Sequence, residues 1–318
     1  MIHLPPYLVV ALAASSQHSA RVAFGPTMGL PRRCGPPIGL TPPPAAVDAL
    51  ASDVDGMDEM ALKLVEASDD ASKFRPTRGA DGRPEPVLTL PGDTLETTPF
   101  MGYVTAASTI LTLMVVVRAF VMSTSALWPI LGVAMGGFLG ELFSGCFHWA
   151  TDNYGSLKTP VVGFACAAFQ GHHLAPWTIS HRTFPNNVYK IASATIPLIA
   201  AVICLLPPIG AATVAVMFYL QLVAQEFHRW THTPPSLLPA WKKRLQRAGL
   251  ALPMQMHIAH HKPPFDKHYC ILTGRLNPVL DSSPIYFWRR LEAFFFRLNG
   301  QEPLSWKDPK VKELALSL

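Results

Sequence analysis

Residues Tyr103 to Met122 read YVTAASTILTLMVVVRAFVM, which is long enough to cross a bilayer as one helix. Arg118 is the only charged residue of this run and lies near one end, from where its side chain can reach the interface. The short uncharged turn Ser123 to Ala126 leads to a second apolar run, Leu127 to Phe147. Four glycines between positions 132 and 140 are typical of close helix packing in membranes. The two runs therefore predict a helical hairpin.

A second pair of apolar runs follows, at Ile191 to Leu206 and Ile209 to Val223, with Pro207 and Pro208 between them. Two consecutive prolines interrupt a helix, so these runs also predict a hairpin. Each run has only about 15 or 16 apolar residues where about 20 are usual, and we expect thin, deep or partly re-entrant helices. The predicted fold class is an all-α membrane protein with about four transmembrane helices.

The topology brings distant polar segments together. If both hairpins return to the side from which they came, residues 147–190 and the chain from Glu226 onward lie on one face of the membrane. The turns of the hairpins carry no Lys or Arg, whereas the basic residues between positions 158 and 247 fall on the opposite side. The charges therefore support the same topology.

The composition agrees with a membrane protein. Of 318 residues, 49% are hydrophobic and 15% charged, and the mean hydropathy is +0.24. Acidic residues gather early and basic residues after Lys158, which suits a basic face against anionic headgroups and argues against a nucleic-acid partner. The five cysteines are scattered without a CxxC pair, so neither a disulfide framework nor a cysteine zinc site is expected.

The chain divides into four parts. Residues 1–44 are expected to be a signal or transit peptide, because an apolar core at Leu4 to Ala14 precedes a basic, proline-rich stretch. Its Ala23-Phe24 step resembles the junction of bipartite plastid presequences; a leader without an address is the alternative. Residues 45–99 are interpreted as a disordered acidic and proline-rich linker without chemistry, apart from a possible short helix at Val54 to Glu66. Residues 100–300 form the membrane domain, and 301–318 a C-terminal tail.

Ten of the twelve histidines lie between Phe147 and Tyr269. They include four clusters at spacings that place side chains on one helix face or side by side. The members of the clusters are His148 with Asp152; His172 with His173; His228 with His232; and His257 with His260 and His261.

Eight histidines and a carboxylate exceed the needs of one metal ion and predict a two-metal site. Neutral imidazole binds zinc, copper and iron, and a site of this kind that oxidises a lipid would need a redox metal such as iron, because zinc cannot supply electrons. Asp152, Glu226 and Gln170 are expected to accept hydrogen bonds from the imidazoles and fix their tautomers; Asp152 could equally bind the metal.

Isolated histidines at a membrane interface are usually polar anchors, and His3, His18 and His268 are assigned to that role. His181 stays open, because it follows no tight spacing. Glu141 lies seven residues before His148 on the same face, as either a functional intramembrane acid or a partner of Arg118.

Four stretches carry a resemblance to a known family: HWATDNYGS from His148, QGHHLAPWTISHRTFPNN from Gln170, QEFHRWTHT from Gln225, and HIAHHKPPFDKHYCILTGRLNPVLD from His257. The chain from about 102 to 296 resembles the lipid desaturases that include plasmanylethanolamine desaturase, the bacterial light-response protein CarF and the plastid palmitate trans-delta-3 desaturase. The resemblance gives the nine clustered residues a catalytic metal-binding role, with two non-haem iron ions, dioxygen as co-substrate and an external electron donor.

The branches of the family differ in the residues at some motif positions. The plasmanylethanolamine branch places a histidine where this chain has Arg182, and His181 is then a displaced version of that ligand. The Pro-Trp-Thr-Ile wording from Pro176 and the Asn186-Asn187 pair are more similar to the plastid branch, whereas His232-Thr233 resembles the other.

The plastid branch implies a trans double bond at C3 of palmitate in phosphatidylglycerol, made in a plastid membrane with a ferredoxin-type donor. Arg182, Arg229 and Lys262 are candidates to bind the phosphate of the substrate, and Glu141 is a further substrate-site candidate. The alternative is a plasmanylethanolamine desaturase forming the vinyl ether of plasmalogens in the endoplasmic reticulum. A related hydroxylase and, from another class, a non-catalytic haem or metal-binding membrane electron carrier also stay open.

Overall fold

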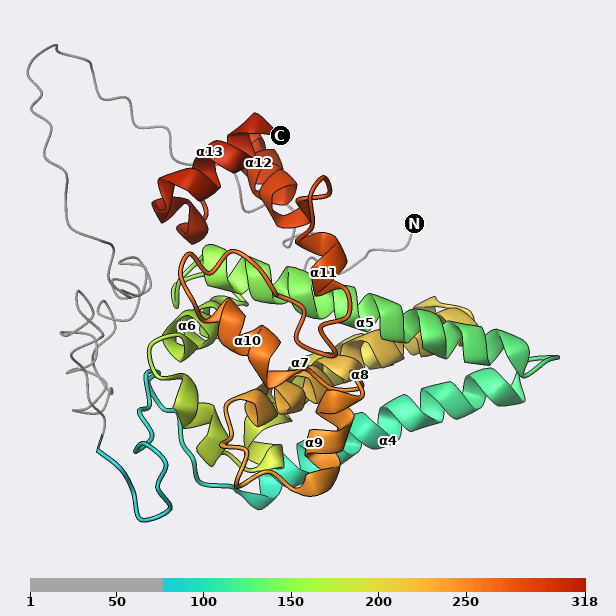
Figure 1. Ribbon diagram of the computed structural model, residues 1–318. Coiled ribbons are helices and arrows are strands. Elements are labelled where there is room, and N and C mark those ends of the chain that lie inside the picture. Colours follow the sequence, from blue (N-terminus) through green and yellow to red (C-terminus); the bar gives the residue numbers. More distant parts are fainter. Residues whose placement is uncertain (1–76) are drawn as a thin grey trace, which may run out of the picture.

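The computed structural model describes residues 77–318, which are nearly all helical and contain no strand (Figure 1). The expected leader, residues 1–44, and the possible helix at Val54 to Glu66 lie outside the described residues. Four long helices form the body of the molecule: α4 (Pro99–Val121), α5 (Leu127–Asn153), α7 (Phe184–Leu205) and α8 (Pro208–Thr231). All four are long and apolar enough to cross a membrane, which confirms the predicted all-α, four-span fold of a multi-pass membrane protein.

The helices are held together by close packing of small residues. Gly136 of α5 lies so close to α8 that a Cβ atom there would stand 2.6 Å from the backbone oxygen of Thr213. Between apolar surfaces in lipid, such backbone approach gives the van der Waals contact that stabilises a helix pair. Gly132, Gly136 and Gly140 therefore have the packing role that the pattern predicts, whereas a Cβ atom at Gly137 would meet nothing within 4 Å.

The expectation that the second hairpin has short helices was wrong. Helices α7 and α8 contain 22 and 24 residues, because both continue beyond the apolar run into polar sequence. Asn186 and Asn187 lie in the first turn of α7, and the Thr183 side chain caps that turn by accepting from the Asn186 backbone N–H. Pro185 fits there because the first turn needs no N–H from it.

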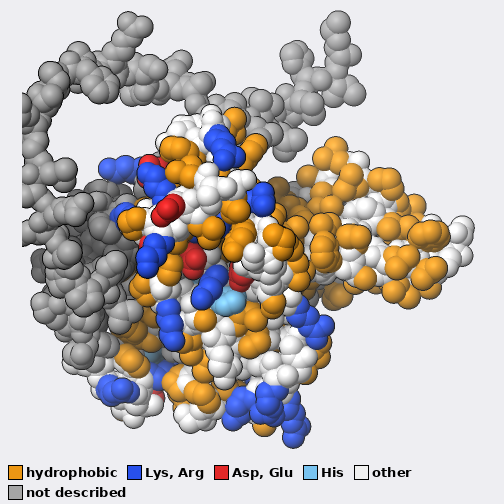
Figure 2. Space-filling view, turned by 45° about the horizontal axis from the view of Figure 1, so that its top comes forward, with side chains coloured by type: hydrophobic (Ala, Val, Ile, Leu, Met, Phe, Trp, Pro, Cys, Tyr) orange, Lys and Arg blue, Asp and Glu red, His pale blue; other side chains and the backbone are white. Residues whose placement is uncertain are grey.

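The shorter helices gather at the end of the bundle opposite both hairpin turns (Figure 1). They are α6 (Gly163–His172), η2 (Pro176–His181), α9 (Ala240–Arg247), α10 (Met254–His260), α11 (Asn277–Leu280), α12 (Phe287–Asn299), η3 (Leu304–Lys307) and α13 (Pro309–Ser317). On the face in Figure 2, hydrophobic side chains cover the hairpin end, and Lys and Arg side chains gather at the other end. The histidine-bearing segments thus share the polar end, as the predicted topology requires.

Two segments outside the four helices also pack onto the domain. Residues 77–98, within the range interpreted as linker, run along η2 and bury Val87 and Leu90 against Ala167 and Leu174. Residues 301–318, interpreted as a tail, form η3 and α13, and the indole of Trp306 is buried there. Residues 77–98 make this contact with only a few side chains, whereas α13 buries Val311 and Ala315, which lie one helix turn apart.

Candidate metal centre and adjoining cavity

The nine residues predicted as ligands meet at the polar end of the bundle, in two adjacent groups. In each group, one ligand atom from every residue lies within 4.8 Å of the others. We call the first the five-histidine group, which consists of His172, His228, His232, His257 and His261. The second is the mixed group, which consists of His148, Asp152, His173 and His260.

Helix ends position these side chains. Helix α5 continues to Asn153, so His148 and Asp152 lie one turn apart on one face, as expected. Helix α8 carries His228 in its last turn and ends at its C-cap residue His232. Neighbouring residues divide between the groups: His172 belongs to one and His173 to the other. Consecutive residues of a helix point about 100° apart, so one histidine pair serves two centres.

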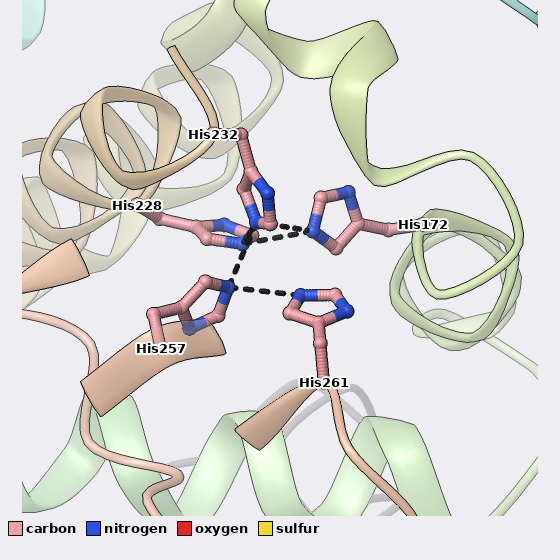
Figure 3. A group of neighbouring side chains, drawn as sticks. All are labelled: His172, His228, His232, His257 and His261. Carbon is pink, nitrogen blue, oxygen red and sulfur yellow. Dashed lines mark hydrogen bonds between the residues drawn. The ribbon is translucent and has the colours of Figure 1, made fainter. Parts of the chain in front are cut away.

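In the five-histidine group, the same ring atom of every residue points to a common centre (Figure 3). The Nε2 atoms of neighbouring rings are 2.8–3.1 Å apart. A neutral imidazole Nε2 has either one proton or one lone pair, so His232 Nε2, which is near three others, cannot form three hydrogen bonds. Nitrogen ligands about 2.1 Å from a metal and about 90° apart lie about 3 Å from each other. The group therefore fits a metal ion.

In the mixed group, Asp152 faces three imidazoles. Its Oδ2 lies 3.2 Å from Nε2 of His148 and 3.3 Å from Nε2 of both His173 and His260. Nδ1 of His148 donates to the Tyr269 carbonyl, so its Nε2 offers a lone pair. Nδ1 of His260 likewise donates to the Lys267 carbonyl over 2.8 Å, so its Nε2 also offers a lone pair. Lone pairs that face a buried carboxylate need a cation between them, so the mixed group also fits a metal ion.

The protonation state of the histidines also suits metal binding. Burial lowers the pKa of His172, His257 and His261 well below the usual range. The next largest cause is the neighbouring His228 for His172 and His257, and His173 for His261. Burial lowers the pKa of His260 to about 4, and the nearby His148 acts in the same direction. These imidazoles are neutral near pH 7, which is the form that binds a metal.

Two residues expected to orient the imidazoles do not touch them. Glu226 instead accepts hydrogen bonds from Arg229 and from the Trp230 indole. The Gln170 amide donates to the carbonyl of Thr151. That expectation was wrong because carbonyl oxygens have the role, and a backbone carbonyl carries no signal in the sequence.

The orienting carbonyls come from the loop that follows α10. Tyr269 supplies the acceptor for His148, and Lys267 the acceptor for His260. The same loop places the Phe265 ring edge-on to the His173 imidazole, with the ring centroids 5.2 Å apart. This loop therefore fixes ring orientations in the mixed group and excludes water from it.

Three further candidates lie elsewhere. His181 donates from Nε2 to the Pro84 carbonyl, 2.9 Å away, and belongs to neither group. Nδ1 of His268 lies 2.7 Å from the Asp281 carboxylate. Glu141 accepts hydrogen bonds from the backbone N–H and the hydroxyl of Thr273, so of the two roles left open for it the pairing with Arg118 is not the one found.

A cavity of about 560 Å³ adjoins the five-histidine group, within the usual size range of ligand sites. It follows α7 from Asn186 to Leu198, a distance of about 18 Å along the helix axis. His172, His228 and Arg182 line its polar end. Its other end, between the membrane-spanning helices, is lined by apolar residues that include Leu198, Phe218 and Phe143.

The comparisons with known proteins agree with this arrangement. A family model described as the lipid desaturase domain matches residues 137–306, which is more than half of the chain and includes all nine residues. The chain is 39% identical over 182 residues to fatty acid desaturase 4, chloroplastic, of Arabidopsis thaliana, covering 57% of this chain and 56% of that protein. The aligned part is thus little more than half of the plant protein.

Two more distant relatives carry another name. The chain is 32% identical to plasmanylethanolamine desaturase 1 of Mus musculus, over 55% of this chain and 67% of the mouse protein. It is 31% identical to plasmanylethanolamine desaturase of Myxococcus xanthus, over 55% of this chain and 64% of that protein. No solved structure matches. The domain match, which covers more than half of the chain, shows that this multi-pass membrane protein belongs to the lipid desaturase family.

Proposed function

We propose that this chain is an acyl-lipid desaturase that introduces a trans double bond at C3 of palmitate in phosphatidylglycerol. One observation carries the proposal: the five-histidine group lies at the polar end of an apolar cavity, through His172 and His228. A phospholipid that enters with its headgroup at this end extends its acyl chain along α7 toward Leu198. The carbons nearest the histidines are then those next to the ester.

The five-histidine and mixed groups would each hold one of two iron ions. Iron bound there supplies the oxidation: dioxygen, two electrons and two protons are consumed, two hydrogens leave adjacent carbons, and two water molecules form. The residues of the chain hold the substrate and keep water away. Phe147 and Phe169 give the cavity an aromatic wall, which fixes the chain beside His172.

The two electrons need an external donor, and we propose one of the ferredoxin type. Residues 240–290, on the polar side of α8, contain nine Lys or Arg and two acidic residues. A surface of this charge attracts an acidic protein and speeds its association. The donor would approach the loop after α10, where Lys262 and Lys267 are exposed and His261 lies next to Lys262.

A plastid membrane is the proposed location, supported by the chloroplastic name of the plant relative. A fluorescent fusion at the C-terminus would test this in an algal or plant cell. Fluorescence that coincides with chlorophyll supports the proposal, and a reticular pattern around the nucleus contradicts it.

The activity is tested by expression in a host that makes phosphatidylglycerol, together with a reduced ferredoxin system. Palmitate with a trans double bond at C3, located by mass spectrometry after derivatisation, is the expected product. The His172→Ala variant should make none. The His181→Ala variant is the matched control, because His181 contacts Pro84 and not the metal groups, and it should retain product formation. Wild-type extracts without any new double bond would overturn the proposal.

The second candidate is formation of the vinyl ether of plasmalogens, and the name of the mouse relative favours it. The cavity argument applies equally, since the first alkyl carbons of an ether lipid also lie beside the glycerol. Acid-labile plasmalogen in a host that supplies the ether lipid would decide for this activity. A hydroxylated lipid in the same extracts would identify a hydroxylase instead.

A further inference from the structure

The segment before the first membrane helix forms one wall of the cavity. We call residues 83–96 the strap. Its Val87 N–H donates to the Thr178 hydroxyl over 2.9 Å, and the Arg83 guanidinium donates to the Ser180 carbonyl over 2.7 Å. Val87 lines the cavity together with Thr89, Leu90 and Asp93 of the same strap. The strap precedes residues 137–306, to which the family model is matched, so it is a feature beyond the matched domain.

Charged side chains meet where the strap crosses the polar end of the cavity. The Asp93 carboxylate binds the Arg182 guanidinium and lies 3.6 Å from Lys190 Nζ. Arg182 also donates to the carbonyl of Thr94 over 3.0 Å and to the Asn186 side chain over 2.7 Å. The Arg182 and Asp93 side chains are 15% and 11% exposed, and Lys190 is 37% exposed. Two cations and one carboxylate thus leave one positive charge at the headgroup end.

We propose that Arg182, Lys190 and Asp93 form a subsite for the phosphodiester headgroup of a phospholipid, in which the strap sets headgroup selectivity. A phosphodiester carries one negative charge, which balances the single positive charge of the subsite. The planar guanidinium and the ammonium suit phosphate oxygens, and Lys190 is held over the Phe164 ring, 3.6 Å from its centre. The wall below is apolar and accepts the chains. This inference deepens the proposed function by naming the residues that recognise its substrate.

Asp93 gives the subsite its second preference. A carboxylate beside the phosphate only accepts hydrogen bonds, so it favours a headgroup that carries donors. The hydroxyls of glycerol and the ammonium of ethanolamine are donors, whereas the trimethylammonium of choline has none. The net positive charge further favours the anionic phosphatidylglycerol over the zwitterionic phosphatidylethanolamine. The expected order of binding is phosphatidylglycerol, then phosphatidylethanolamine, then phosphatidylcholine.

Lipid binding is measured without turnover. The purified full chain in detergent is mixed with equal amounts of the dipalmitoyl forms of the three lipids, and bound lipid is read by native mass spectrometry. The wild type should retain phosphatidylglycerol about tenfold over phosphatidylcholine, which corresponds to about 1.4 kcal/mol. Excess inorganic phosphate should leave the lipid bound. Displacement by phosphate would mean a free-anion site and would overturn the assignment.

Two variants separate the roles of the charges. Lys190→Gln should abolish the preference for phosphatidylglycerol over phosphatidylethanolamine, and Asp93→Asn the preference for phosphatidylethanolamine over phosphatidylcholine. Lys158→Gln is the matched control, since Lys158 is exposed and does not line the cavity, and it should leave both ratios unchanged. Unchanged metal content shows that the variants are folded. The proposal stands only if both ratios shift; equal retention of the three lipids by the wild type also overturns it.

The failure of this inference differs from the failure of the proposed function. Selective binding of phosphatidylglycerol without any double bond in lipid extracts would leave the subsite intact and remove the desaturation. Desaturated lipid together with unselective binding would support the desaturation and overturn the headgroup subsite.

Discussion

Replacing Asp152 with asparagine is expected to empty the mixed group of its metal while the five-histidine group stays loaded. The amide keeps the size of the side chain and one oxygen but removes the only carboxylate among the four ligands. Asp152 is 9% exposed, so water cannot replace the lost charge. The two groups share no residue, and the five Nε2 atoms around His232 are untouched by the change.

The magnitude follows from the contacts of Asp152. Its Oδ2 lies 3.2–3.3 Å from three imidazole nitrogens, and its Oδ1 is buried without a hydrogen bond from the described residues. Mutation of a residue that only supports a ligand typically lowers metal affinity about 10- to 100-fold. A residue that contributes the charge directly should cost at least the upper figure, about 2.8 kcal/mol. At micromolar protein, a metal bound moderately tightly is then lost during purification.

Iron per chain is measured by plasma mass spectrometry on protein purified under identical conditions. We expect about two iron atoms in the wild type and about one in Asp152→Asn. The His181→Ala variant, which removes a histidine outside both groups, should retain two. Retention of two iron atoms by Asp152→Asn, or loss of iron from His181→Ala, would refute the assignment of ligands.

Three further outcomes are expected from the described contacts. Because the folded-state pKa of His260 is about 4, below its usual 6.5, the unfolded chain takes up the proton first as pH falls, and the metal-free protein should lose stability between pH 6.5 and 4. His260 alone contributes up to about 1.4 kcal/mol per pH unit to this loss, and a melting temperature that is the same at pH 7 and pH 5 contradicts it. Glu292→Ala leaves the buried Arg289 guanidinium without its carboxylate, 2.7 Å away, and should cost about 3–5 kcal/mol in chemical denaturation; a loss below 1 kcal/mol speaks against a buried pair. Gly136→Ala should destabilise the protein by about 1–3 kcal/mol, since its Cβ would meet a backbone oxygen of α8 at 2.6 Å. Gly137→Ala, whose Cβ meets nothing within 4 Å, should be neutral or stabilising by up to about 1 kcal/mol, and equal melting temperatures of the two variants would count against the packing argument.

Much of the fold and the site could be predicted because the signals are local. A run of twenty predominantly apolar residues with a single charge, such as Tyr103 to Met122, specifies a membrane span, since the bilayer core has a fixed thickness. A histidine four residues from a carboxylate, as in His148 and Asp152, specifies one helix face. Two hairpins then bring the clusters to one side, and the structure places all nine residues there.

The ends of the helices were harder to predict from the sequence. The apolar run of α7 begins at Ile191, but the helix begins at Phe184, because a Thr183 cap and Pro185 start it in polar sequence. Hydropathy detects the part of a helix that lies in lipid and not its continuation into the headgroup region.

The sequence by itself therefore determined the membrane fold and the identity of the clustered residues. Only the tertiary structure decided how His172 and His173 divide between two groups, which carbonyls orient the imidazoles, and that Asp93 meets Arg182 and Lys190 at the cavity. The first set depends on spacing along one helix, which the chain encodes locally. The second depends on contacts between segments up to 121 residues apart, which form only when the segments pack.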